Sequence, residues 1–459
     1  MESAEILEIK EIIKDSLSTI LKYIGCSSYE IDECKSIIET YRTDKDEDKR
    51  RELTRVLNNV FFNTYTECVY KSLNSPSVPV PVQMFLLFGY MDEELAGVQN
   101  SIILCKLTES YNDTPRRNCV SLYEWLSMIY NGSRMPSMND MSVDYDQELR
   151  ERLKKREITN GEYEAELRDR NKKLEYEIRN AVSIMRRVSG QPTRFLAIFN
   201  EDSLDRPLNK SILVNKEVEN TLDSISNIDV NIFNHEYTYS NPKAGIDSIR
   251  LQKEIKPDII LLPIIGSHPM MWQEIEGRNR QSAARFFYPK FLNGELRTLL
   301  IRNCGEYRWE YCKRSQGARW QDIGDPSICS YFLNYIQTYK KNHHISPEQK
   351  EKISNQYAKF RHNIKEIFVD DYIKFIANEA EGNIRLNKLS RGILMRFCVL
   401  NKDIRKELIK NSLYTEFLNV VNNRIEHDKK LLVALKKRIE DNGVSIPPEV
   451  REYEMLINR

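Results

Sequence analysis

The sequence predicts a mostly α-helical protein with a small central α/β unit, in which three parallel strands alternate with helices as βαβαβ. Three observations lead to this fold class. Apolar residues recur at helical spacing in both terminal thirds of the chain. The middle holds an unbroken apolar run, residues 259–265, which is typical of a buried strand in a parallel sheet. Two shorter apolar runs precede it, with helix-compatible segments between them.

Residues 1–140 are predicted to form an N-terminal helical domain. Isoleucine and leucine recur every three or four residues from Glu5 to Ile24, and Gly25 supplies a stop signal for that helix. A longer helix is expected within residues 44–73. The prolines of residues 75–82 predict an extended connector before the next buried segment.

Residues 141–190 are predicted to form a charged helical hairpin or connector. Thr159 or Asn160 should start a new helix there, because both residue types cap helices. A narrow apolar stripe follows, with the members Leu167, Leu174, Ile178, Ala181, Met185 and Val188. The stripe either forms the seam of a homodimer or packs on its own chain, and its short length favours packing on its own chain.

Residues 191–330 contain the predicted α/β unit. Its strands are expected at residues 194–199, at residues 229–233 and within the apolar run that follows Lys256 and Pro257, with helices at about 215–226 and 242–254. Pro263 has no amide hydrogen, so strand pairing should stop or bulge near it, leaving residues 264–268 as a loop. The carboxyl ends of parallel strands meet at one edge of a sheet, which is where ligands bind.

Charged and imidazole side chains follow each predicted strand. Asp202 comes after the first strand, His235 and Glu236 come after the second, and His268 comes after the third. Such a set suits acid and base chemistry near neutral pH, or metal binding. Loops at strand ends are polar in any case, and no spacing matches a known metal-ligand motif, so we expect no metal site. We take these residues as candidates for a ligand site, and no cofactor is assigned.

Arginines and aromatic residues are interleaved between residues 272 and 320, where three of the four tryptophans lie. Trp272, Arg278 and Arg280 are closest to the third strand, and we add them to the candidate ligand-binding residues. Arginine suits phosphate contact and aromatic rings suit stacking. Because glutamates lie among the arginines, an internal network is favoured over a ligand site. Arg308 and Arg319 are expected to be structural, and Arg278 to line a cleft.

Residues 331–459 are predicted to form a C-terminal helical domain. Ser346, Pro347 and Glu348 provide a cap, a first-turn proline and an acidic first turn. Further helices are expected within residues 384–397, 403–412 and 413–440.

Composition limits the class of protein. The 459 residues are 41% hydrophobic and 30% charged. Because 69 basic residues nearly balance 68 acidic ones, the net charge of +1 is too small to attract a polyanion such as nucleic acid. The nine scattered cysteines are expected to be reduced and structural, and no apolar run is long enough to span a membrane. We therefore expect a cytoplasmic protein without a membrane partner.

Several short runs resemble a family of uncharacterised bacterial proteins, some of which carry a separate cyclic-nucleotide-binding module. The runs are Met271 to Ile275 with Gly277 and Arg278, Arg308 to Glu310, Gln316 to Trp320, and Arg385 to Lys388. The resemblance covers most of residues 80–410 and implies a bacterial origin and a place in signalling. The phosphate cassette of a cyclic-nucleotide module is not visible in this chain, and the resemblance assigns no functional residues.

These observations favour a regulatory or scaffold protein that binds a ligand or a protein partner in a cleft at the carboxyl edge of the α/β unit. The expected partner is another protein or an anionic small molecule, and the expected assembly is a monomer or a homodimer. One alternative is an enzyme acting on a phosphorylated or otherwise anionic substrate. A second alternative, nucleic-acid binding through the arginine- and tryptophan-rich segment, is not favoured.

Overall fold

The computed structural model describes residues 4–111, 118–131, 143–190, 196–272, 284–343 and 345–459. Side chains are described for these residues except 143–148, 167, 168 and 170. The chain divides into two compact units. The first unit comprises Met1–Val218, Asp258–Met270 and Arg285–Glu295, and the second comprises Glu219–Pro257, Met271–Ala284 and Leu296–Arg459. The predicted division into four segments along the chain stays a prediction.

A small sheet has three of its strands in the first unit, and its fourth strand begins there and continues into the second unit. Its strand order is β1-β4-β6-β5, with β1 (Cys119–Ser121), β4 (Asp258–Gly266), β6 (Arg285–Leu292) and β5 (Met270–Trp272). Strand β4 pairs in parallel with both β1 and β6. Every residue of β6, and every residue of β4 except Ile265, is buried, so these strands form the core of the unit. Their parallel pairing places the carboxyl ends of β4 and β6 at one edge.

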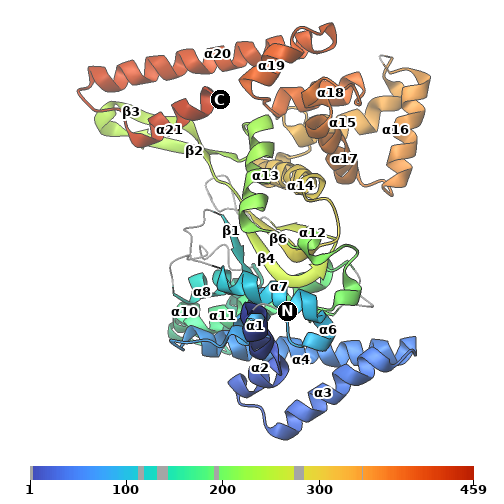
Figure 1. Cartoon of the computed structure of the whole chain (residues 1–459). Helices are drawn as coiled ribbons and strands as arrows, with labels where there is room; N and C mark the ends of the chain where they lie inside the picture. The colour runs from blue at the N-terminus through green and yellow to red at the C-terminus, as the bar shows by residue number, and fades with distance from the viewer. Residues whose placement is uncertain (1–3, 112–117, 132–142, 191–195, 273–283, 344) are drawn as a thin grey trace. The chain divides into compact units, whose positions relative to one another are not determined.

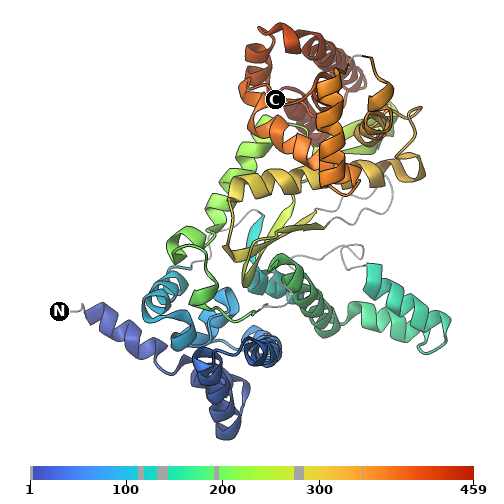
Figure 2. The ribbon, with the colours of Figure 1, turned by 90° about the vertical axis from the view of Figure 1, so that its right-hand side faces the viewer.

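Helices α5, α8, α11 and α12 contact the strands of this sheet. Figure 2 shows α9 and α10 side by side, next to α11. The helices of the first unit are α1 (Ala4–Ile13), α2 (Ser16–Ile24), α3 (Ser28–Thr43), α4 (Glu47–Leu73), α5 (Val80–Phe88), α6 (Glu93–Ala96), α7 (Val98–Glu109), α8 (Leu122–Tyr130), α9 (Val143–Lys154), α10 (Asn160–Arg168), α11 (Arg170–Val188), the 3-10 helix η1 (Glu201–Ser203) and α12 (Leu208–Ser211). Helix α13 (Asn215–Ile228) begins in the first unit and ends in the second.

The second unit combines a β-hairpin with helices. Strands β2 (Asn234–Asn241) and β3 (Ile246–Glu254) pair antiparallel, and α20 and α21 pack on the hairpin (Figure 1). The helices of this unit are α14 (Leu296–Gln316), α15 (Ile328–Thr338), α16 (Pro347–Lys359), α17 (Ile364–Ala377), α18 (Lys388–Phe397), α19 (Lys402–Leu408), α20 (Ser412–Asp441) and α21 (Pro448–Ile457). The hairpin turn contains the short 3-10 helix η2 (Pro242–Ala244). Three further 3-10 turns follow helices α14, α15 and α17, namely η3 (Gly317–Arg319), η4 (Tyr339–Lys341) and η5 (Glu379–Glu381).

The predicted fold class is confirmed: the protein is mostly helical, with a small α/β unit whose strand β4 pairs in parallel with β1 and β6. Strand β4 lies where the apolar run predicts it, and its pairing with β6 shifts register between Leu262 and Ile265, as expected beside Pro263. The strand nevertheless continues to Gly266, so the loop begins at Ser267, three residues later than the predicted start at Ile264. The bulge leaves Pro263, which has no amide hydrogen, outside the ladder of paired residues, and the strand continues beyond it.

The other two predicted strands are wrong. Residues 196–200 form no strand, because the amide of Ala197 bonds to the Asn58 side chain and that of Phe199 bonds to the Gly89 carbonyl. Residues 194 and 195 lie outside the described residues. Residues 229–233 form a single bridge and a turn, and the hairpin begins only after them. Residues 242–254, predicted as a helix, contain the hairpin turn and β3.

The helical predictions hold better. Helix α10 starts after Thr159, whose side chain accepts a hydrogen bond from the amide of Glu162 in a capping box. The stripe on α11 packs inside the chain, because Leu174, Ile178 and Met185 are each less than 5% exposed. The intramolecular interpretation is therefore confirmed for these residues, and the side chain of Leu167 lies outside the described set.

Candidate functional site

A pocket opens at the carboxyl edge of the sheet in the first unit. Ile265, Gly266 and Ser267 at the end of β4, and Asn293 just after β6, line one side of it. The end of α3, the first turns of α4, the end of α11 and the segment around η1 supply the rest of the lining. The pocket has a volume of about 420 Å³, which is in the range of small-molecule sites.

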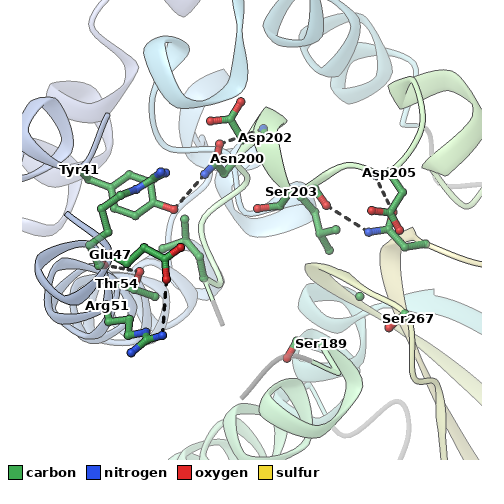
Figure 3. Close-up of a pocket in the computed structure, with 15 residues that line it drawn as sticks. Tyr41, Glu47, Arg51, Thr54, Ser189, Asn200, Asp202, Ser203, Asp205 and Ser267 are labelled. Atoms are coloured by element: carbon green, nitrogen blue, oxygen red, sulfur yellow. Dashed lines mark hydrogen bonds and ion pairs between the residues drawn. The ribbon is translucent and has the colours of Figure 1, made fainter. Parts of the chain in front are cut away.

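Hydrogen-bonding groups dominate the lining of this pocket, which we call the edge pocket (Figure 3). Its lining residues are Tyr41, Glu47, Arg50, Arg51, Thr54, Ser189, Leu196, Asn200, Asp202, Ser203, Asp205, Ile265, Gly266, Ser267 and Asn293. Hydroxyl, amide, guanidinium and carboxylate groups therefore face one small volume. Such a lining fits a polar molecule better than an apolar one.

Two asparagines hold the loop that carries the acidic side chains. The Asn200 side chain accepts a hydrogen bond from the Asp202 amide at 3.1 Å and donates one to the Tyr41 hydroxyl at 3.3 Å (Figure 3). Asn293 donates to the Ser203 carbonyl at 3.1 Å, and its own amide bonds to the Gly266 carbonyl at 2.8 Å. The loop is thereby tied both to α3 and to the strand edge.

Gly266 is required by a close backbone approach. A Cβ atom on this residue would lie 2.5 Å from the Val188 carbonyl oxygen and 3.0 Å from the Ser189 Cα atom. The end of α11 can therefore pass the end of β4 only if this position has no side chain. The amide of His268 donates to the same Val188 carbonyl at 3.0 Å, which fixes the approach.

The charges of the edge pocket are divided between two walls. On α4, Arg51 pairs with Asp48 at 3.0 Å, whereas the Arg50 guanidinium lies 4.8 Å from the centre of the Tyr41 ring and has no carboxylate partner among the described residues. On the opposite segment, the carboxylates of Asp202 and Asp205 have no partner among those residues either. The guanidinium of Arg50 and the carboxylates of Asp202 and Asp205 are therefore available to bind a ligand.

The structure places the predicted site residues in different units. Asp202 lines the edge pocket, and His268 directly follows its lining residue Ser267. His235 and Glu236 belong to the second unit, as does the partly exposed Trp272 at the end of β5. Arg278 and Arg280 lie outside the described residues. The premise that placed His235 beside His268 is wrong, because His235 lies on the β2–β3 hairpin and not after a strand of the parallel sheet.

His235 is an interior residue. It is 1% exposed, its Nε2 atom lies 2.6 Å from the Tyr307 hydroxyl, and its ring centre lies 4.6 Å from that of Tyr311. Burial lowers the pKa of His235 to about 4. At neutral pH it is therefore an uncharged core residue that packs against tyrosines.

The second unit has a cavity of its own, which we call the hairpin cavity. It has a volume of about 620 Å³ and lies between the β2–β3 hairpin, α14, η3 and the start of α15. Its charged and reactive lining residues are Glu236, Arg250, Arg308, Tyr311, Cys312, Arg319 and Asp325. Glu236 is thus a lining residue, but of a different site from Asp202.

The described part of the arginine- and tryptophan-rich segment divides into internal and exposed residues. Arg308 is held by Asp229 and Asn231, and Trp309 is 4% exposed, as an internal network requires. The anion partner of Arg308 is Asp229, not one of the nearby glutamates. Arg319 was expected to be structural, but it is exposed, because it lies on the short η3 turn at the surface.

Three lining residues that α3 and α4 bring to the edge pocket were not predicted, namely Tyr41, Arg50 and Arg51. No local pattern marks them, because only tertiary packing brings α4 to the strand edge. Asn293 could have been predicted, since it follows residues 286–292, which are apolar or aromatic except for Lys290, and precedes Gly294.

Within the ranges that the structure describes, no group of three or more histidine, cysteine or acidic residues is placed to hold a metal ion. Among those same residues, no helix is long and apolar enough to cross a membrane.

Comparison with known proteins gives one finding. Residues 317–455 match a family model described as a domain of unknown function (DUF8509), and this stretch lies within the second unit. No curated protein and no solved structure matches the chain. The match agrees with the expected similarity to a family of unknown function, while the bacterial origin and the link to cyclic-nucleotide-binding modules stay predictions.

Proposed function

We propose that this is a cytoplasmic regulatory protein that binds a small polar molecule in the edge pocket. The observation that carries the proposal is the position of the pocket, at the carboxyl ends of two parallel strands and lined by side chains from several separate segments. Ligands of α/β proteins bind at this edge of the sheet. The regulatory part of the proposal is supported by the sequence resemblance alone.

The charges of the edge pocket indicate the class of ligand. Two arginines against three carboxylates do not suit a polyanion. Arg50, which has no carboxylate partner among the described residues, suits one phosphate or carboxylate group. Asp202 and Asp205 suit hydroxyl groups, because carboxylates are strong acceptors. We infer a hydroxyl-rich molecule with one anionic group, such as a sugar phosphate or a nucleoside monophosphate.

A thermal-shift screen tests this proposal. The panel contains sugar phosphates, nucleoside monophosphates, free sugars and inorganic phosphate. We expect at least one phosphorylated, hydroxyl-rich compound to raise the melting temperature, and inorganic phosphate alone to have no effect. A panel in which no member stabilises the protein would contradict the proposal.

Three variants locate the binding. Asp202→Asn removes a carboxylate from the pocket, and Arg50→Gln removes the cation opposite it. Each should weaken binding about tenfold or more, the value of one charge-assisted hydrogen bond. Arg55→Gln is the matched control, because Arg55 lies exposed on the same helix α4 and does not line the pocket. Equal affinity in all three variants would place the ligand elsewhere.

One observation favours an enzyme as the second candidate. The Ser267 hydroxyl lies 2.7 Å from Nδ1 of His268, and Ser267 lines the edge pocket. A histidine at this distance can act as a general base toward a serine nucleophile. If the protein catalyses group transfer, Ser267→Ala should abolish turnover of the bound compound while its binding persists. Turnover that survives this substitution would reject the candidate.

A further inference from the structure

The β2–β3 hairpin has one apolar face and one polar face. Tyr237 and Leu251 pair across the hairpin and pack in one hydrophobic cluster with residues of α20 and α21. Side chains alternate between the two faces of a strand, so the flanking positions point to the opposite face. Five polar residues on that opposite face line the hairpin cavity, namely Asn234, Glu236, Thr238, Arg250 and Gln252. The polar face of the hairpin is therefore one wall of the cavity.

Two opposite charges on this wall do not pair with each other. In the ladder, Glu236 is paired with Gln252, and Arg250 lies two residues before Gln252 on β3. Glu236 and Arg250 are therefore diagonal neighbours on one face, within reach of each other's long side chains. Both side chains are exposed, and neither makes an ion pair or a side-chain hydrogen bond with the described residues. A carboxylate and a guanidinium at neighbouring positions are thus available to a ligand.

Two more arginines line the cavity, Arg308 from α14 and Arg319 from η3. Arg308 uses its Nε and Nη2 atoms for Asp229 and Asn231, so Asp229 balances its charge. Its third nitrogen, Nη1, has no hydrogen-bond partner among the described residues, and the side chain is 10% exposed. Arg319 is exposed and has no carboxylate partner among those residues. These segments therefore offer a second unpaired cation, Arg319, and the remaining donors of Arg308.

Asn234 adds an unsatisfied acceptor near Glu236. Its Nδ2 atom donates to Gln252 Oε1 at 3.2 Å, but its Oδ1 atom is buried and has no hydrogen-bond partner among the described residues. Buried polar atoms are normally hydrogen-bonded. Asn234 and Glu236 lie on the same face of β2, two residues apart, so an ammonium group, which only donates, suits both acceptors.

The unpaired charges of the cavity indicate the class of its ligand. They are the carboxylate of Glu236 and the guanidinium groups of Arg250 and Arg319, because the other lining carboxylate, Asp325, already interacts within the chain. A complementary molecule carries one ammonium group and two carboxylates. We propose that the hairpin cavity binds an acidic amino acid or a short acidic peptide, with its ammonium group at Glu236 and its two carboxylates at Arg250 and Arg319. All of these residues lie in the second unit, so the proposal does not depend on the edge pocket.

The rest of the lining suits such a molecule. The volume of about 620 Å³ is larger than a single amino acid needs, so the cavity also admits a dipeptide. The start of α15, with Ser327 and Ile328 in the lining, adds the positive end of a helix dipole, which favours a carboxylate. Apolar side chains that suit the carbon skeleton of the ligand complete the lining, among them Ile232, Pro326 and Phe397.

Isothermal titration calorimetry of the full chain tests the proposal. The panel contains L-glutamate, L-aspartate and a dipeptide of alanine and glutamate, each at up to millimolar concentration. We expect at least one member to bind with one-to-one stoichiometry. Analogues that each lack one charged group should bind about tenfold or more weakly, the value of one charge-assisted hydrogen bond. For glutamate these analogues are N-acetylglutamate, glutamine and isoglutamine, which lack the ammonium group, the side-chain carboxylate and the α-carboxylate.

Variants paired with these analogues locate each contact. Glu236→Gln should weaken the binding of glutamate about tenfold or more but leave that of N-acetylglutamate unchanged, because this analogue has no ammonium group. Arg319→Gln should abolish the preference for glutamate over one of the two analogues that lack a carboxylate. Both residues are exposed, so these changes should leave the fold intact, which circular dichroism checks. Lys253→Gln is the matched control, because Lys253 is exposed on β3 but does not line the cavity.

The edge-pocket variant Asp202→Asn separates this site from the one proposed above, and it should bind the amino acid as the parent protein does. Loss of binding in Asp202→Asn but not in Glu236→Gln would place the ligand in the edge pocket and overturn the proposal. Equal affinity for glutamate and all three analogues would also overturn it. If no member of the panel shows saturable binding, the proposal is wrong, whereas the function proposed for the edge pocket is unaffected.

Discussion

Replacement of Arg308 tests whether the arginine-rich segment braces the second unit from inside. The Arg308 Nε atom lies 2.7 Å from Asp229 Oδ2, and its guanidinium also donates to Asn231 Oδ1 at 2.6 Å. The side chains of Arg308 and Asp229 are 10% and 0% exposed. Tyr372 donates to the same carboxylate at 2.7 Å. The pair is therefore buried and hydrogen-bonded at several points.

Arg308→Ala leaves the Asp229 carboxylate buried without its cation. Removing one partner of such a pair costs about 3 to 5 kcal/mol of unfolding free energy. Urea unfolding followed by circular dichroism measures this loss, with Lys410→Ala as the control. Lys410 pairs with Glu407 at 2.7 Å, but both side chains are about 70% exposed, so its removal should cost at most about 1 kcal/mol.

A double variant separates the pair from simple loss of packing. If the charges are coupled, Arg308→Ala with Asp229→Ala should be less destabilised than the sum of the two single variants. A loss below about 1 kcal/mol for Arg308→Ala, equal to that of the exposed control, would refute the internal brace.

Three further predictions concern pH, the α11 stripe and the strand edge. Burial lowers the pKa of His235 from 6.5 to about 4, so the unfolded state binds more protons than the folded state between these two pH values. The free energy of unfolding should therefore fall as the pH drops from 6.5 to about 4. Urea unfolding at several pH values should show a weaker dependence of this free energy on pH in His235→Gln than in the parent protein. Leu174→Ala should cost about 2 to 5 kcal/mol without changing the mass measured by light scattering, whereas Glu175→Ala, exposed on the same helix, should cost less than about 0.5 kcal/mol. A change of oligomeric state in the leucine variant would favour the dimer seam. Gly266→Ala should lower the melting temperature because its Cβ would lie 2.5 Å from a carbonyl oxygen, while Gly161→Ala, with nothing within 4 Å, should leave it equal or higher.

Local signals were sufficient to predict most of the helices. Helix α16 begins at Pro347 behind a Ser346 capping box, and α20 spans the charged segment that the sequence marks as one long helix. The exception is the first helix, which breaks into α1 and α2 at Asp15 with φ of 56°. Nothing in the apolar spacing signals that break, because the spacing continues across it.

The strands were harder to predict because their signals depend on burial and pairing. Strand β6 lies in the segment of interleaved arginines and aromatic residues, and no strand was predicted there. Its Arg285 and Lys290 are buried, and Arg285 pairs with Glu177 at 3.2 Å. The hairpin was missed although its turn ends at Gly245 with φ of 69°, a conformation that favours glycine. Only β4 was predicted as a strand and found as one, because its run of residues 259–265 is apolar throughout.

The candidate site was predicted in part. The carboxyl edge of β4 does carry a pocket, and Asp202 lines it. The prediction that His235 and Glu236 lie at the same edge depended on a parallel strand at residues 229–233. That strand does not form, so the prediction is wrong for both residues. Arg50 and Tyr41 come from helices about 150 residues earlier in the chain, so only the folded structure brings them there.

Binding in the edge pocket is tested most directly by a crystal structure of the protein with the compound that raises the melting temperature most in the thermal-shift panel. We expect electron density for the ligand in the edge pocket, with its anionic group at Arg50 and its hydroxyl groups at Asp202 and Asp205. Ligand density in the hairpin cavity, beside Arg250 and Arg319, with an empty edge pocket would contradict it.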